Sequence, residues 1–111
     1  MAEPVSIIIA IITPKPGNFD KVWALLDDLI AGVKDLEPNC TLFQAHREVE
    51  PSAPGEEEIF MIERFKDNDA VVFHRENPAL LNITRIVTEH NLLTKPIYTK
   101  TVRPEKGFVR T

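Results

Sequence analysis

Residues 57–78 contain the side chains of this sequence that are best suited to acid–base chemistry. Residues 59–65 alternate as a strand with apolar side chains on both faces, except for Glu63 on one of them. A carboxylate in that position is costly unless it is hydrogen-bonded or paired, so we expect a partner for Glu63 nearby. The helix that follows carries His74, whose imidazole titrates near neutral pH. The stretch therefore predicts a carboxylate and an imidazole on consecutive elements.

Four further side chains are candidates for contact with a small molecule. His46 lies on the same side of an expected strand as Leu42, where it either faces a cavity or is wetted by solvent at a rim. Arg64 could orient an anionic substrate or pair at a subunit interface, and Tyr98 could donate a phenol hydrogen bond if it faces inward. Trp23 follows the apolar spacing of a helix, which favours a core position over a platform for a bound molecule.

The elements that position these residues follow from apolar periodicity. Asn18 offers an N-cap to a long helix, and Asp67 offers one to the short helix that ends at His74. Pro78 ends that short helix and can begin the next one, because proline suits the first helical position. We expect helices after these three positions, the last reaching about residue 91, and strands at residues 5–12, 41–48, 59–65 and 97–102.

The order strand, helix, strand, strand, helix, strand predicts an α+β fold, the ferredoxin-like βαββαβ arrangement with a four-stranded antiparallel sheet. In that fold the helices cover one face of the sheet only. The two strands expected at its centre, residues 5–12 and 59–65, are apolar on both sides. A monomer would leave a large apolar face in water, so we expect a homodimer in which two sheet faces pack together.

The length of the chain fits a single domain. The chain has 111 residues, 43% of them hydrophobic, which is enough for one core. We expect one domain over residues 1–111, with a core at about 5–102 and a C-terminal arm at 103–111 that is ordered only if it docks.

Charge and composition exclude several function classes. A net charge of -4 without a cluster of Lys and Arg argues against a nucleic-acid partner. The apolar run at 5–12 is too short to span a membrane, so we expect no membrane partner. The single cysteine, Cys40, fits a reducing compartment such as the cytoplasm. The carboxylates at 56–58 do not converge, and we expect no metal site.

Four segments carry a resemblance to a known family. They are KPG at residues 15–17, EPNC at 37–40, ERFKD at 63–67, and His74 followed by NP at 77–78. In order and spacing they resemble the antibiotic biosynthesis monooxygenase family over roughly residues 5–102. The resemblance implies a dimeric α+β barrel, which agrees with the homodimer expected from the apolar sheet face.

The resemblance also implies an activity, the cofactor-independent oxygenation of small electron-rich aromatics such as anthrones or quinols. In that chemistry the substrate anion passes an electron to O₂, and the protein supplies a base, a dry pocket and hydrogen-bond donors. His74 matches the family's helix histidine and is the candidate base, although it could instead be a structural histidine. Glu63 matches the family's glutamate, for which we expect a structural role. Phe65, a further candidate for contact with the substrate, stands where many members have Trp, so a role that needs an indole donor is lost.

Two other functions stay open at this point. Related members of the family degrade haem, which would make His74 an axial ligand and haem the cofactor. A third possibility is a dimeric small-molecule binder or accessory protein that has kept the barrel without the chemistry, and Phe65 favours it.

Overall fold

The computed structural model describes residues 5–111, and its elements follow the predicted order. The last helix ends at Glu89 rather than near residue 91, and the last strand begins one residue later than predicted. The elements are β1 (Ser6–Ile12), α1 (Phe19–Leu36), β2 (Cys40–Arg47), β3 (Ile59–Phe65), α2 (Asn68–His74), α3 (Pro78–Glu89) and β4 (Tyr98–Val102).

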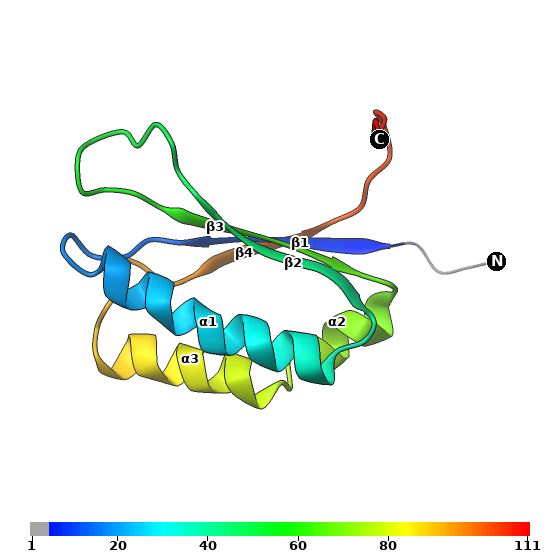
Figure 1. Ribbon diagram of the computed structural model, residues 1–111, viewed down its shortest axis with the longest axis horizontal. Coiled ribbons are helices and arrows are strands. Elements are labelled where there is room, and N and C mark those ends of the chain that lie inside the picture. The colour runs from blue at the N-terminus through cyan, green and yellow to red at the C-terminus, as the bar shows by residue number, and fades with distance from the viewer. Residues whose placement is uncertain (1–4) are drawn as a thin grey trace.

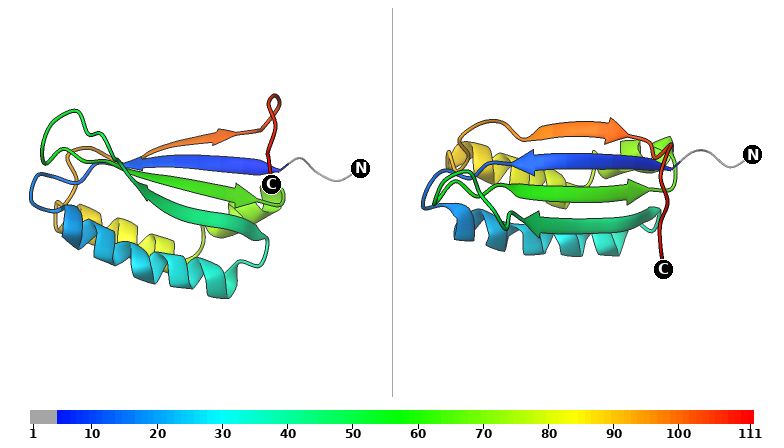
Figure 2. Two further views of the ribbon diagram at one scale, coloured as in Figure 1. Left: turned by 45° about the horizontal axis from the view of Figure 1, so that its top comes forward. Right: turned by 90° about the horizontal axis from the view of Figure 1, so that it is seen from above.

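The four strands form one antiparallel sheet in the order β2-β3-β1-β4, so β3 and β1 lie at its centre as predicted. The helices all lie on one side of the sheet, as Figure 1 and the two views of Figure 2 show. Figure 1 places α1 and α3 side by side under the sheet and α2 near the C-terminal end of α1. This is the predicted α+β, ferredoxin-like arrangement.

Alternate residues of the central strands face the helices and form the core. Ile8, Ala10 and Ile12 of β1 are buried, and Ala10 pairs with the buried Met61 of β3. The apolar stripe of α1 packs onto this surface, and Trp23 belongs to it as a half-buried side chain. The helix-covered face is therefore the face that contains the core.

The side chains between them point to the other face of the sheet, which we call the open face. No helix within the described residues covers it (Figure 2). Ile9 pairs with Ile62 on this face and is 36% exposed, and Tyr98 at the β4 edge is 51% exposed. The C-terminal arm, residues 103–111, rises on this side and leaves Phe108 exposed (Figure 1). The centre of the open face, on β1 and β3, is apolar, as the strand alternation predicted.

Local contacts at the helix ends agree with most of the sequence signals. Asp67 caps α2, because its Oδ1 accepts a hydrogen bond from the Ala70 N–H at 2.9 Å. Asn18 is the N-cap residue of α1, as predicted, but its side chain makes no capping bond; its backbone N–H donates to the Lys15 carbonyl at 2.9 Å. The turn at residues 15–17 therefore positions the start of α1 through the backbone.

Helices α1 and α3 approach each other closely at one point. A Cβ added at Gly32 of α1 would lie 2.5 Å from the Cβ of Ala79 in α3. Real Cβ atoms do not come this close, so the contact requires glycine. This contact fixes the spacing of the two helices next to Asn77, the N-cap residue of α3.

Candidate active site

The buried polar side chains of the helix-covered face meet at His74, the last residue of α2. Its Nδ1 lies 2.8 Å from Oε2 of Glu37 and 3.0 Å from Oε1 of the same carboxylate. Its Nε2 lies 3.4 Å from Oε1 of Glu63, which is an ion-pair distance longer than a normal hydrogen bond. All three residues are buried, each at most 5% exposed. We call Glu37, His74 and Glu63 the Glu–His–Glu cluster.

Three different elements deliver the cluster. Glu37 is the C-cap residue of α1, and its backbone N–H still donates to the Val33 carbonyl, which directs the side chain back toward α2. Glu63 is an inward-facing residue of β3, on the same side of the strand as Met61. His74 reaches both carboxylates because α2 ends beneath the sheet. The partner that strand periodicity required for Glu63 is therefore His74.

Asn77 holds the cluster to the neighbouring helices. Its Nδ2 donates to Oε2 of Glu37 at 2.8 Å and to the Gly32 carbonyl at 3.2 Å. Its Oδ1 accepts from the Ala79 N–H at 2.9 Å and so caps α3. One amide side chain thus connects the end of α1, the start of α3 and the carboxylate that contacts His74.

Opposing effects act on the protonation of His74. Burial by itself would lower its pKa, because desolvation penalises the imidazolium. Hydrogen bonding to Glu63 and Glu37, together with their negative charges, outweighs burial and raises the pKa above its ordinary value. A neutral ring that donates from Nδ1 to Glu37 would turn a lone pair toward Glu63. A proton shared between Nε2 and Glu63 removes that repulsion.

A cavity of about 220 Å³ lies between the sheet and the helices, with Glu63 and His74 on its wall. Its exposed lining residues are Arg75, Thr99 and Thr101, so the cavity opens along the β4 edge of the sheet. Glu63 lies two strands in from that edge. The remaining lining residues are all apolar: Ile8, Ala10, Ile12, Leu26, Leu29, Met61, Leu80, Ile83 and Ile97. The cavity therefore combines an apolar wall with an acid–base pair.

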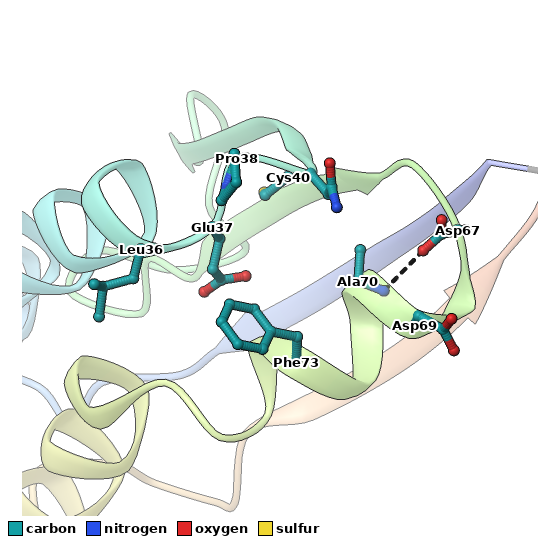
Figure 3. A pocket seen from close by; sticks show the side chains of 9 residues that line it. Leu36, Glu37, Pro38, Cys40, Asp67, Asp69, Ala70 and Phe73 are labelled. Atoms are coloured by element: carbon teal, nitrogen blue, oxygen red, sulfur yellow. Dashed lines mark hydrogen bonds between the residues drawn. The ribbon is translucent and has the colours of Figure 1, made fainter.

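A second hollow lies outside, between the C-terminal end of α1 and α2. It is a groove of about 590 Å³ whose lining includes Glu37, Cys40, Asp67, Asp69 and Phe73. Figure 3 shows the Glu37 carboxylate directed toward α2 beside Phe73. The Glu–His–Glu cluster thus lies between the outer groove and the inner cavity, because Glu37 lines the former and the other two line the latter.

The two phenylalanines beside His74 and the thiol of Cys40 near Glu37 are not reactive. The rings of Phe65 and Phe43 lie 5.1 and 5.6 Å from the imidazole, centroid to centroid, and flank it. Burial, with the charge of Glu37, raises the pKa of the Cys40 thiol to about 11. A thiol with that pKa is protonated near neutral pH, so Cys40 behaves as a small apolar residue.

The structure brings together some of the predicted site residues and separates others. His74 and Glu63 face the cavity, and Phe65 packs directly against His74. Trp23 lies elsewhere, because its ring stacks on Phe19 at 5.6 Å and does not line the cavity. It is a packing residue, which is the position that its helical spacing favoured.

The other three candidates lie on the open face. Nδ1 of His46 lies 3.1 Å from the Phe60 carbonyl, and Nε of Arg64 donates to Oγ1 of Thr41 at 2.9 Å. Tyr98 is exposed on the same face. All three are separated from the cavity by the sheet itself, so none is placed to contact a molecule bound beside His74.

Sequence reasoning missed Glu37, Asn77 and Arg75 as site residues. Glu37 and Asn77 entered the sequence analysis only within segments that carry the family resemblance, EPNC at 37–40 and NP at 77–78, without a role of their own. A buried carboxylate and amide at two helix ends are the signal that could have found them, because the chain must satisfy both. Their contact with His74 depends on tertiary structure, since Glu37 is 37 residues away in sequence.

Residues 5–111 contain neither a membrane-spanning helix nor a metal-binding group of side chains. None of the helices is long and apolar enough to cross a membrane. No group of three His, Cys, Asp or Glu side chains in this part of the chain could hold a metal ion.

Comparison with known proteins agrees with the fold. The chain resembles Rv0793 from Mycobacterium tuberculosis at 29% identity, covering 93% of this chain and 97% of that one, with a TM-score of 0.75. A conserved protein from Methanosarcina mazei shares 20% identity over 92% and 94% of the two chains, with a TM-score of 0.78.

A protein from Caulobacter crescentus that is provisionally named an antibiotic biosynthesis monooxygenase shares 16% identity over 94% and 92%, also with a TM-score of 0.78. At these identities the second and third structures show the fold alone. Among curated proteins, none matches the chain significantly. The family model described as antibiotic biosynthesis monooxygenase matches residues 5–85, which is most of the chain. This chain belongs to the antibiotic biosynthesis monooxygenase family.

Proposed function

We propose that this protein is a cofactor-independent monooxygenase of a small quinol. The observation that carries the proposal is the placement of His74, buried between two carboxylates on the wall of an otherwise apolar cavity. In its neutral form this imidazole can accept a proton from a bound hydroxyl group, and the two carboxylates stabilise the imidazolium that results. The apolar wall keeps water from the resulting anion, which favours its reaction with O₂.

The chemistry needs no reductant other than the substrate. His74 and Glu63 take a proton from a phenolic O–H, and the phenolate passes one electron to O₂ to give a substrate radical and superoxide. Recombination forms a bond between carbon and oxygen. Cleavage of the O–O bond then leaves one oxygen atom on the ring, and the other leaves as water with protons and electrons from the quinol. The role of the chain is to hold and move protons at Nε2 of His74.

The size of the cavity selects among aromatic substrates. An apolar cavity of about 150 Å³ is known to hold benzene. A cavity of about 220 Å³ suits a substituted single ring or two fused rings. A three-ring anthrone would require the helices to move away from the sheet. We therefore favour a one- or two-ring quinol as the substrate.

The proposal includes a homodimer formed through the open face. Ile9 and Ile62 lie at the centre of this face on adjacent strands, and no helix of the described chain covers them. Monomers seldom expose a continuous apolar surface of this kind. A second copy of the chain, packed sheet against sheet, would bury it.

The residues around His74 do not fit a haem group. Nδ1 of His74 is bound to Glu37, and an iron bonded to Nε2 would have to displace the Glu63 carboxylate that lies 3.4 Å away, which a transferred proton does not. The cavity of about 220 Å³ is also too small for a porphyrin. A porphyrin is several times larger than benzene, which a cavity of about 150 Å³ holds. We therefore do not propose haem degradation.

Oxygen consumption with a panel of one- and two-ring quinols tests the proposal. We expect wild-type turnover and a loss of at least about 100-fold in His74→Gln, the lower range for a general base. His46→Ala, which changes a histidine of the open face, is the matched control and should keep its activity. No turnover by the wild type with any quinol would reject the oxygenase and favour a non-catalytic binder. Full activity in His74→Gln would reject His74 as the base.

A further inference from the structure

We propose that the Glu–His–Glu cluster is a proton path through the protein, in which Glu37 exchanges protons with the solvent of the outer groove on behalf of His74 and the cavity. Glu37 is a positioning and relay residue in this scheme, because it contacts His74 and does not line the cavity. The existence of the path rests on geometry, and only its use during turnover rests on the proposed function.

The geometry gives the two ring nitrogens of His74 different environments. Nε2 faces Glu63 and the cavity, whereas Nδ1 contacts Glu37, which lines the groove. An imidazole can accept a proton at one nitrogen while it releases another from the opposite nitrogen. A proton taken up at Nε2 therefore allows the Nδ1 proton to move to Oε2 of Glu37, 2.8 Å away, and then to water. One proton enters and one leaves, so no charge accumulates.

The cavity wall offers a trapped proton few other positions. Arg75 cannot accept one, since its guanidinium is already protonated, and most of the wall is apolar. Glu63 supplies the carboxylate on the wall, and it already faces His74. A proton removed from a bound substrate away from the opening at the β4 edge is therefore stored in the cluster or passes through it.

The other titratable groups near the path have different roles. Oδ1 of Asp67 accepts the hydrogen bond that caps α2. The Cys40 thiol, with a pKa of about 11, stays protonated. Asp69 lines the same groove as Glu37 but has no bond to His74 among the contacts of that ring. Asp69→Asn therefore makes the same change of charge as Glu37→Gln without touching the path, which makes it the matched control.

The path can be tested without any substrate. Exchange of the His74 ring N–H protons with water can be measured by NMR on ¹⁵N-labelled full-length protein near neutral pH. We expect Glu37→Gln to slow this exchange by at least about tenfold, because it removes the group that takes the proton to the groove. Asp69→Asn should exchange at the wild-type rate. Wild-type exchange in Glu37→Gln would overturn the proposal and indicate that protons leave through the opening at the β4 edge.

A second variant covers the case in which Glu37→Gln does not fold. Glu37→Asp keeps the charge but withdraws the carboxylate by one methylene from Nδ1, so exchange should again be slower than in the wild type. Unchanged exchange in a folded Glu37→Asp would likewise count against the path.

Turnover separates this inference from the proposed function. If quinols are oxidised, Glu37→Gln should lower kcat by about tenfold or more with little change in KM, and it should enlarge the solvent deuterium isotope effect. Normal kcat and isotope effect in Glu37→Gln would remove the path while leaving the oxygenase in place. Slow ring exchange in that variant of a protein that oxidises no quinol would support the path and reject the oxygenase.

Discussion

The two faces of the sheet use polar residues in opposite ways, although they are built from the same strands. On the helix-covered face, Glu63 and His74 are buried and each has an ionisable partner. On the open face, the next residue along β3, Arg64, is exposed and donates a single bond to a threonine hydroxyl. The difference teaches that one step along a strand separates an acid–base site from an ordinary surface residue. The cover on each face decides which of the two a residue becomes.

The physical reason is the cost of burial. A buried charge that loses its partner remains in a medium that solvates it poorly, whereas an exposed charge regains water. Substitutions of similar chemistry should therefore have large effects on one face and small effects on the other. The following predictions test that contrast, from the largest expected effect to the smallest.

The largest contrast is between the two histidines. His74→Ala leaves Glu37 and Glu63 buried without their common partner, and we expect the free energy of unfolding to fall by about 3–5 kcal/mol. His46→Ala removes one exposed hydrogen bond and should cost no more than about 1 kcal/mol. Urea unfolding at one fixed protein concentration measures both. Equal losses in the two variants would contradict the contrast between the faces.

The next prediction concerns what covers the open face. Ile9→Asp places a charge at the centre of the proposed dimer interface, and we expect it to weaken association by about 2 kcal/mol or more. Sedimentation velocity should show dimers for the wild type and monomers for this variant. Leu81→Asp, at an exposed leucine on α3, is the control and should remain dimeric. A well-folded monomeric wild type at micromolar concentration would reject the dimer.

Asn77 offers a sharper division within the covered face. Asn77→Ala removes the cap of α3 together with the bonds to Glu37 and Gly32, and we expect a loss of about 1–3 kcal/mol in the free energy of unfolding. Asn77→Ser can keep the cap but cannot reach Glu37. Thermal unfolding of both variants separates the two contributions. A Ser variant as stable as the wild type would mean that the bond to Glu37 adds little.

The smallest effect should come from pH. The pKa of His74 is raised in the folded state above its ordinary value of 6.5, so its protonation stabilises the fold. This stability is fully present below pH 6.5 and is lost as the pH rises through the raised pKa. Thermal midpoints should therefore decline above pH 6.5 in the wild type and in His46→Ala. The same decline in His74→Gln would assign it to another group.

Much of the fold could be predicted from the sequence because its signals are local. Strand alternation assigned Glu63 to a buried face, and Asp67 and Pro78 marked helix starts that the structure confirms. Asn18 is the N-cap residue of α1 as predicted, but without a capping bond from its side chain, since the turn at residues 15–17 positions α1 through its backbone.

The site was less predictable because its contacts join distant parts of the chain. Nothing local to Glu37 indicates that its carboxylate turns back to meet a histidine 37 residues later. The sequence did not show on which side of the cavity wall His46, Arg64 and Tyr98 lie, because it does not show which face of the sheet the helices cover. Alternation defines two faces of each strand but does not state which of them borders a cavity.

The close contact of Gly32 with Ala79 has a consequence for engineering. The contact holds α3 against α1 beside Asn77. The Glu–His–Glu cluster therefore lies where the two helices have least freedom to separate. Ile97 and Glu63 line the cavity near opposite ends of β1. Ile97 directly precedes Tyr98, which pairs with Ile11, whereas Glu63 pairs with Ile8. Substitution of Ile97 by a smaller residue should therefore admit larger substrates, while the Glu–His–Glu cluster keeps its geometry.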